Sequence, residues 1–204
     1  MRRPDLIADC SNCAALCCVA PSFDTSEDFA IDKAAGAHCP HETVEHRCAI
    51  HAEREALGFS GCVIYECYGA GPHATRRFAG SSGLDAERNE VFLVLRVVHE
   101  LLWQLTEAVK LIPNATPEVL AQIASAVAAL DAVAHEPTAS LLAADLCPHQ
   151  AAARAALQRV AQALSSERLP KRHLPVLPDA TLRTRPHESP VARTHACAPH
   201  DTRE

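Results

Sequence analysis

The chain has 204 residues, a formal net charge of −6 at neutral pH and ten cysteines. Binding to nucleic-acid phosphates needs clustered Lys and Arg, and the sequence contains no basic stripe, so we expect no nucleic-acid partner. No internal repeat of solenoid length is visible. The length suits one domain of ordinary size or two small ones.

The cysteines are concentrated near the N-terminus. Eight of the ten lie within the first 67 residues, and the first two are separated by two residues, a spacing that lets both sulfurs of a tight turn face one ion. Thiolates are the ligands that zinc and iron prefer, so the sequence predicts metal binding. The candidate ligands are Cys10, Cys13, Cys17, Cys18, Cys39, Cys48, Cys62 and Cys67.

A disulfide framework is the alternative explanation for clustered cysteines, and it requires an oxidising compartment. The first ten residues, MRRPDLIADC, contain no apolar run, so we expect no signal peptide and a cytoplasmic location. We also expect no membrane span, because Arg96, Glu100 and Gln104 interrupt the most apolar stretch. In a reducing cytoplasm, metal binding is favoured over disulfides and over unligated buried thiols.

Spacing does not determine how the cysteines share metal ions. Cys10 and Cys13 form a chelating pair that either Cys17 or Cys18 can join, because adjacent residues rarely direct both side chains at one ion. Eight thiols would satisfy two four-sulfur sites, or one iron–sulfur cluster and one structural zinc. Four histidines among the cysteines could each replace a thiolate, although an exposed loop position explains any one of them better. These are His38, His41, His46 and His51.

The first 75 residues are predicted to be mostly loop, with a few short ordered pieces. So few apolar residues can hardly fold such a segment by burial alone, and metal ligation would supply the missing free energy. The expected pieces are a helical turn over 13–20, a short strand over 29–32, a helix over 48–57, a strand over 62–65 and a break at 69–72.

The middle of the chain is predicted to be helical. From Arg88 to Ile112, apolar residues recur every three or four positions, which indicates one long amphipathic helix. Thr116 and Pro117 mark the start of the next helix. Short connections between such helices are typical of an antiparallel bundle of three or four, which could also bind a protein partner. The further expected helices cover 116–134, 138–146 and 148–166.

We therefore expect a mainly α protein in three parts. They are a cysteine-rich metal-binding unit over 1–75, a helical bundle over 84–168 and a disordered tail over 169–204, which is rich in Pro and poor in aliphatic residues.

Several further residues have features of a site, but a structural explanation is preferred for each. We interpret His99 and Trp103, one turn apart on the long helix, as packing or interface residues. Cys147, between two helices, is expected to be buried or to cap a helix. The ligand-like spacing in the tail is ascribed to chance composition; it involves His195, Cys197 and His200.

The full cysteine pattern reads Cys10-x2-Cys13-x3-Cys17-Cys18, then Cys39-Pro40, Cys48-Ala-Ile-His51 with Arg54, Gly61-Cys62 and Cys67. This pattern resembles the zinc- or iron-chelating CxxCxxCC domain family. That family includes flagellin lysine methylases, in which the motif is implicated in holding iron. The chain differs in having three residues before the double cysteine, and in having Glu55 where the family often has proline.

Longer segments carry a closer resemblance. DC-x2-C-x3-CCVAP, DFAIDK-x-AG, RC-x-IH, GF-x-GC, YECYGAG and HELLWQLTEA are similar to the N-terminal region of actinobacterial pentapeptide-repeat proteins, over roughly residues 8–165. In that group this region is usually followed by five-residue repeats, and no such period follows Leu169. The resemblance implies relatives without implying a reaction.

Two functions of different classes follow from these observations. The first is a cytoplasmic protein that binds zinc or iron, the latter also as an iron–sulfur cluster, and has a structural, sensory or partner-binding role. The second is an iron–sulfur redox or methyl-transfer metalloenzyme related to flagellin lysine methylases. We favour the first, because the sequence contains no glycine-rich nucleotide loop, nucleophile elbow, HExxH helix or pair of catalytic carboxylates.

Overall fold

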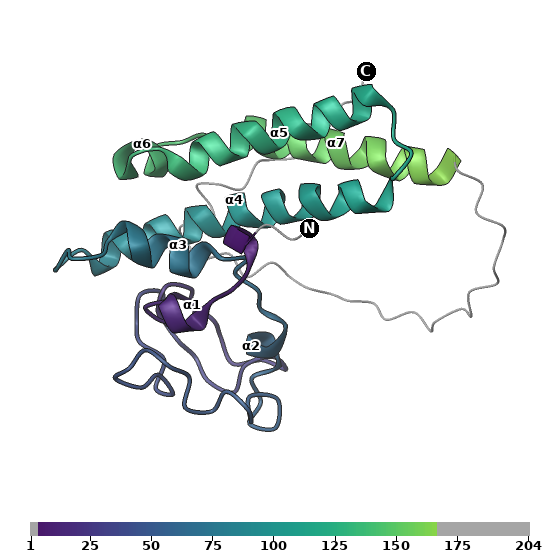
Figure 1. The fold of residues 1–204 in the computed structure, drawn as a ribbon. Coiled ribbons are helices and arrows are strands. Elements are labelled where there is room, and N and C mark those ends of the chain that lie inside the picture. Colours follow the sequence, from purple (N-terminus) through teal and green to yellow (C-terminus); the bar gives the residue numbers. More distant parts are fainter. Residues whose placement is uncertain (1–3, 167–204) are drawn as a thin grey trace, which may run out of the picture.

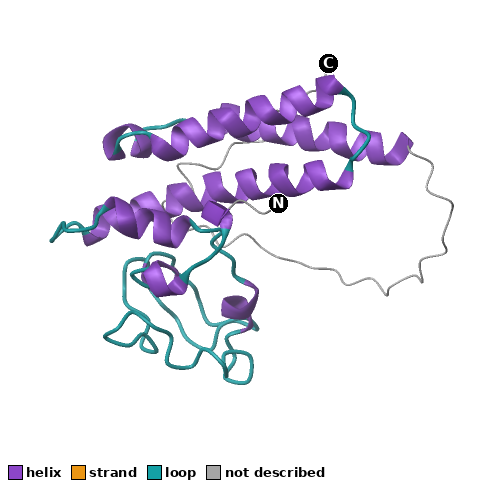
Figure 2. Ribbon diagram, viewed as in Figure 1, coloured by secondary structure: helices purple, strands orange, loops and turns teal. Residues whose placement is uncertain are grey.

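A computed structural model describes residues 4–166, which are mainly helical, as the sequence predicts (Figures 1 and 2). Three long helices dominate: α4 (Asp85–Leu111), α5 (Pro117–His135) and α7 (Cys147–Ser166). The short α6 (Thr138–Leu142) connects the last two. The described residues contain no β-strand, only two isolated β-bridges. The predicted tail lies outside the described part of the chain.

The long helices form an antiparallel bundle in which each contacts the other two (Figure 1). Their formation follows from the apolar stripes in the sequence, because one face of each helix is buried against its neighbours. At the start of α5, Thr116 has an extended backbone and Pro117 occupies the first turn, where its missing N–H costs nothing. The predicted bounds of the three long helices are correct to within a few residues.

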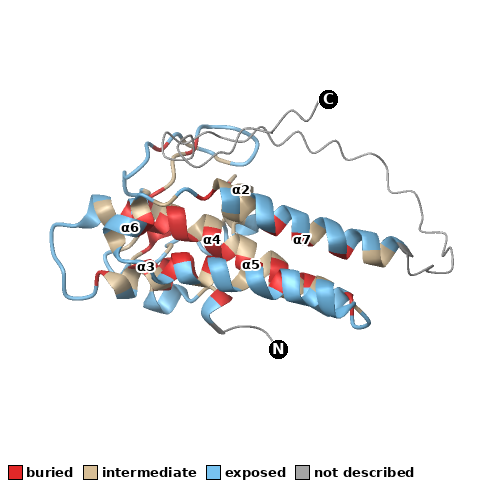
Figure 3. Ribbon diagram, turned by 90° about the horizontal axis from the view of Figure 1, so that it is seen from above, coloured by how far each residue is buried: buried red, intermediate tan, exposed pale blue. Residues whose placement is uncertain are grey.

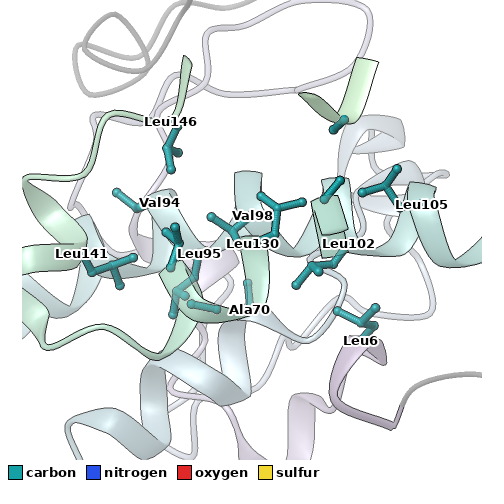
Figure 4. Close-up of a cluster of buried hydrophobic side chains, with 14 of the residues drawn as sticks. Leu6, Ala70, Val94, Leu95, Val98, Leu102, Leu105, Leu130, Leu141 and Leu146 are labelled. Atoms are coloured by element: carbon teal, nitrogen blue, oxygen red, sulfur yellow. The ribbon is translucent and has the colours of Figure 1, made fainter. Parts of the chain in front are cut away.

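The core of the bundle extends into the cysteine-rich segment. Leu6, Leu16 and Ala20 belong to the same buried cluster as the inner face of α4, and Figure 3 shows the buried residues gathered along α4. Burying these side chains contributes roughly 1.5 to 3 kcal/mol for each leucine. The cysteine-rich segment is therefore packed against the bundle. The division into a metal-binding unit over 1–75 and a bundle over 84–168 stays a prediction. Figure 4 shows part of the cluster: Leu6, Ala70, Val94, Leu95, Val98, Leu102, Leu105, Leu130, Leu141 and Leu146.

Short helices punctuate the cysteine-rich segment, which otherwise consists of loops and turns beneath α3 and α4 (Figure 1). The predicted helical turn over 13–20 is confirmed in part by α1. These helices are η1 (Pro4–Leu6), η2 (Cys10–Asn12), α1 (Leu16–Val19), α2 (Ser60–Ile64) and α3 (Ala70–Arg77).

Four local predictions for this segment are wrong. Residues 48–57 form turns and not a helix: the His51 N–H donates to the Cys48 carbonyl at 3.3 Å and the Glu53 N–H to the Ile50 carbonyl at 2.9 Å, each three residues back. Residues 62–65 are not a strand but overlap α2. The expected strand over 29–32 is absent, and next to it only Phe23 and Lys33 form an isolated bridge. The expected break at 69–72 is the start of α3, whose first turn tolerates a proline.

A buried lysine fastens the loops around α1. The Lys33 ammonium donates to the carbonyls of Val19 at 2.9 Å, Ala34 at 3.1 Å and Ala37 at 2.9 Å, so all three of its protons are used. Burial lowers the pKa of Lys33. The side chain is 6% exposed, and the ammonium also lies 5.4 Å from the ring centroid of Phe23. The Lys33 ammonium thus satisfies three backbone carbonyls in loops that have no β-sheet to bond them.

Among residues 4–166, α5 alone has the length and apolar composition that would allow a helix to cross a membrane. Its residues Ile123, Leu130 and Val133 are buried in the core shared with α4 and α7. Core helices of soluble bundles meet the same criteria, so a single such helix is weak evidence for a membrane span. We interpret α5 as a core helix.

Candidate metal centre

All eight predicted cysteine ligands lie in the segment beneath α3 and α4, and all are free thiols. Cys10 and Cys17 are exposed, and the other six are half-buried. Short elements position five of them: Cys10 begins η2, Cys17 and Cys18 lie in α1, Cys62 lies in α2, and Cys67 precedes α3 by three residues. The remaining three, Cys13, Cys39 and Cys48, lie on loops or turns.

Two sulfurs converge on the first turn of α3. A Cβ atom at Gly71 would lie 2.7 Å from the Cys13 sulfur and 3.8 Å from the Cys67 sulfur. No real side chain could occupy that position without moving the Cys13 sulfur. The absence of a side chain at Gly71 therefore leaves room for the sulfurs of two cysteines that are 54 positions apart in the sequence. We call this space the glycine cradle.

Hydrogen-bond donors surround these two sulfurs. Burial raises the pKa of both thiols, and N–H donors act against it: those of Gly71 and Gly69 at Cys67, and that of Leu16 at Cys13, beside the Thr75 side chain. Donors of this kind favour the thiolate, which is the form that binds metal. Thr75 is itself held in place, because its oxygen accepts from the Ala14 N–H at 3.0 Å and donates to the Gly71 carbonyl at 2.9 Å.

Cys17 lies at the centre of the cysteines. Cys17 is exposed as a residue, but neighbouring atoms surround its sulfur; a hydrogen bond with Cys18, and then this desolvation, raise the pKa of the thiol, while the Arg54 guanidinium acts in the opposite direction. Cys17 is also close enough to raise the pKa of further thiols, in each case after burial as the larger cause; these are Cys10, Cys13, Cys62 and Cys67. We define the first group of sulfurs as Cys10, Cys13, Cys17 and Cys67; Cys17 also influences Cys62, which lies outside this group.

Backbone hydrogen bonds bring together a second group. The Cys39 N–H donates to the Cys18 carbonyl at 3.1 Å, the Glu42 N–H donates to the Cys39 carbonyl at 3.0 Å, and Glu42 pairs with Cys48 in an antiparallel bridge. Burial raises the pKa of Cys62 to about 11, and Cys17, Cys39 and Cys48 add to the shift. The second group comprises Cys18, Cys39, Cys48 and Cys62.

Two arginines tie these groups to their loops. Arg47 donates to the carbonyl of Cys10 and, at 3.3 Å, to that of Ser11, so it fastens η2 to the loop that carries Cys48. Arg54 donates to the Cys62 carbonyl at 2.7 Å. Both place a positive charge beside thiols, which favours the thiolate form.

A tyrosine that the sequence reasoning missed adjoins the first group. The phenol oxygen of Tyr65 is buried and has no hydrogen-bond partner. Burial raises the pKa of this phenol, and its electrostatic neighbours are Arg96 and the thiols of Cys17, Cys67 and Cys13. The one feature of the sequence that could have pointed to Tyr65 is its position two residues before the candidate ligand Cys67.

The four histidines among the cysteines do not line up as ligands. Two of them are hydrogen-bonded to Glu42: its buried carboxylate accepts from Nδ1 of His38 at 2.8 Å and from Nδ1 of His46 at 3.0 Å. His41 packs edge-on against Phe59, with centroids 5.2 Å apart, and His51 is exposed. The expectation of ordinary loop positions fits this arrangement.

Within residues 4–166, no three His, Cys, Asp or Glu side chains are already placed to hold a metal ion. Binding would therefore require thiol side chains to turn toward a common point. The donor set nevertheless fits a thiophilic ion: eight free thiols in two groups, a glycine cradle, and N–H groups directed at sulfur. The buried Tyr65 hydroxyl also fits a bound metal centre, because no other group in the described residues accepts its hydrogen bond.

His99 and Trp103 connect this region with α4. His99 is 2% exposed, and its Nδ1 lies 2.8 Å from the Tyr68 carbonyl, so Nδ1 donates and Nε2 accepts from Nδ1 of His73 at 3.0 Å. Trp103 packs on the Tyr68 ring. Both are packing residues, as the sequence predicts, and both contact Tyr68, the residue that follows Cys67.

Two predicted features are less informative. Cys147 begins α7, half-buried, and its N–H bonds the Asp145 carboxylate at 2.9 Å. The tail pattern of His195, Cys197 and His200 lies outside the described residues.

Comparison with known proteins gives a partial relative. The chain is 37% identical over 113 residues to an uncharacterized protein, YybG, from Bacillus subtilis (strain 168), a match that covers 52% of this chain and 40% of that protein. The chain thus spans less than half of the curated relative that it matches. No protein-family model matches the chain, and no solved structure matches it.

Proposed function

We propose that the protein is a cytoplasmic metal-binding protein whose cysteine-rich segment binds zinc or iron, the latter also as an iron–sulfur cluster. The observation that carries this proposal is the presence of eight free thiols, on separate loops and short helices, within the one segment beneath α3. Zinc would cross-link these loops, and an iron–sulfur cluster would in addition carry an electron.

The energetics of the segment support the proposal. Between residues 21 and 67, only Phe23, Phe59 and the buried Lys33 have little exposure to water. Fixing the backbone of one residue costs about 1 to 2 kcal/mol, and so little burial cannot offset this cost over such a long stretch. Metal binding is the usual source of the missing stability in small modules of this kind.

A sensory or partner-binding role is the specific function that we infer. The end of the segment is bonded to the bundle, because the carbonyl of Tyr68, next to Cys67, accepts from buried His99 of α4. The far end of that helix and the start of α5 expose apolar side chains, namely those of Val109, Leu111 and Leu120. Binding or loss of the metal would strengthen or weaken the bond between Tyr68 and His99. A protein partner would bind the exposed apolar side chains at the far end of α4.

Metal analysis tests the proposal directly. The full chain, purified without oxygen, is expected to contain stoichiometric zinc, or iron with the visible absorption of a cluster. The double variant Cys10→Ser, Cys13→Ser should lose metal, whereas Cys147→Ser, which changes a cysteine outside the segment, should retain it. A wild-type protein without stoichiometric metal, or unchanged metal content in the double variant, would overturn the proposal.

A metalloenzyme is the second candidate, and one observation favours it. An open surface hollow of about 340 Å³ lies against Tyr65, and its lining includes Arg96, Glu100 and Asp28. Such a space beside a redox-active centre could admit a small substrate. Reduction of the centre by dithionite, followed by reoxidation with a candidate electron acceptor, would distinguish this function from a structural one.

A further inference from the structure

We propose that Cys10, Cys13, Cys17 and Cys67 share one metal centre, and that the Tyr65 hydroxyl donates a hydrogen bond to a thiolate of this centre. This inference rests on the proposed function. It assigns the ligands of one site and adds a residue that does not bind the metal itself.

The first observation is the missing partner of Tyr65. Its phenol oxygen is buried, and no acceptor contacts it. A buried hydroxyl without a partner is destabilising, so native structures rarely retain one unless an additional group is bound there. Tyr65 therefore marks a place where an acceptor is expected.

The second observation is the identity of the groups nearby. Arg96 lies over the Tyr65 ring, with its guanidinium carbon 5.5 Å from the centroid, but a guanidinium has donors only. The other charged or ionisable groups that influence the phenol are the thiols of Cys17, Cys67 and Cys13. A sulfur is thus the acceptor that the surroundings offer.

Metal binding would turn such a sulfur into a good acceptor. A protonated thiol accepts hydrogen bonds weakly, whereas a metal-bound cysteine is a thiolate, and hydrogen bonds to anionic acceptors are about twice as strong. The Tyr65 hydroxyl would gain its partner in the same step in which the thiols lose their protons.

The third observation assigns the sulfurs to one centre. The three thiols that influence the Tyr65 phenol, those of Cys17, Cys67 and Cys13, are members of the first group. The glycine cradle at Gly71 independently brings the sulfurs of Cys13 and Cys67 together. Cys10 completes the set, since it begins η2, which contacts α3, and lies close to Cys17.

Tyr65 is held in place without the metal. Its N–H donates to the Gly61 carbonyl at 3.1 Å, and its ring packs against the core of the bundle. Arg96, which covers the ring, is fixed by Glu100 at 2.8 Å. A donor whose orientation is set by packing adds to the affinity of a metal site, because little ordering is required when the metal binds.

Cobalt(II) is a suitable probe, since tetrahedral cobalt thiolates absorb in the visible and near-ultraviolet. The full chain is reduced, loaded with cobalt and titrated against a chelator, for wild type, Tyr65→Phe and the control Tyr68→Phe. We expect two cobalt ions in the wild type, one of which binds about 10- to 100-fold more weakly in Tyr65→Phe, with a shifted thiolate charge-transfer band. Tyr68→Phe should match the wild type.

Double variants assign the effect to a centre. Tyr65→Phe should have no further effect on cobalt binding when Cys13 and Cys67 are both replaced by serine. It should retain its full effect when Cys39 and Cys48 are both replaced. Circular dichroism establishes that each variant has the wild-type helix content.

The outcomes separate the two proposals. A wild-type chain that binds no cobalt overturns both the proposed function and this inference. A chain that binds cobalt through its cysteines, with the same affinity and spectrum in Tyr65→Phe, overturns only the inference. An effect of Tyr65→Phe that persists in the Cys13, Cys67 background and vanishes in the Cys39, Cys48 background would overturn the assignment of the four ligands.

Discussion

The ring of Tyr68 packs on the ring of Trp103, with centroids 4.9 Å apart and planes inclined by 31°. Tyr68 directly follows Cys67 and has a φ of 49°, which is the left-handed region that a tyrosine rarely adopts. Two hydrogen bonds hold it there: its N–H donates to the Glu66 carboxylate at 2.9 Å, and its carbonyl accepts from His99 at 2.8 Å. The backbone beside a candidate ligand is thus tied to α4.

This contact predicts an optical response to metal removal. Trp103 is the single tryptophan of the chain, so tryptophan emission comes from one residue, whose surroundings include the Tyr68 ring. Removing the metal with a chelator should release the Cys67 turn and shift or change the intensity of Trp103 emission. The same treatment of Tyr68→Leu, which lacks the ring contact, should give a much smaller change. Identical spectra with and without metal would show that the metal state does not reach α4.

Lys33 is expected to be important for stability. Replacing it with methionine keeps the apolar stem but leaves the carbonyls of Val19, Ala34 and Ala37 without their donor. The free energy of unfolding should fall by about 1 to 3 kcal/mol. Urea denaturation followed by circular dichroism measures this change. The matched control is Lys110→Met, which removes a partly exposed ion pair with Glu107 and should cost less than about 1 kcal/mol.

His73 should make stability depend on pH. Burial, and then the charges of His99, Arg77 and His135, lower the pKa of His73 to about 4, below the ordinary 6.5 of an unfolded chain. Between these values the unfolded state binds more protons than the folded state, so the folded state loses stability as the pH falls through this window.

After allowance for partial exposure to water, the loss attributable to His73 should reach roughly 2 kcal/mol. Denaturation of wild type and His73→Gln at about pH 7.5 and about pH 5 measures it. The variant should show the smaller difference between the two conditions. An equal pH dependence in both proteins would mean that His73 does not titrate as its surroundings indicate.

The bundle is expected to fold without the cysteine-rich segment. A fragment covering residues 84–168 retains the mutual contacts of α4, α5 and α7, and these give it a core of its own. It should show helical circular dichroism, with a lower melting temperature than the full chain, because Leu6, Leu16 and Phe78 no longer cover α4. A fragment without helical signal would show that the segment is part of the folding unit.

The sequence predicted the long helices well because the signals that form them are local. Apolar residues three and four positions apart mark α4, and the Thr116 and Pro117 pair marks the start of α5. The loop-rich segment was predicted less well, since its backbone is held by distant partners. Arg54, for example, bonds Cys62 in a neighbouring element, and no periodicity announces such a bond.

The cysteine ligands could be nominated from spacing, but their grouping could not. Cys67 approaches Cys13 only because α3 packs beside η2, an arrangement that depends on tertiary contacts. Tyr65 was missed for the same reason, because a tyrosine is informative here through its buried and unpartnered oxygen and not through its place in a motif.

The glycine at position 71 also bears on the order in which the chain folds. The first turn of α3 contains both Gly71 and Pro72, and glycine inside a helix is less favourable than alanine by roughly 0.5 to 1 kcal/mol. A peptide of eight residues with such a start has little tendency to form a helix alone. We therefore expect α3 to be a late element that forms after α4 provides a surface and the sulfurs of Cys13 and Cys67 arrive at its first turn.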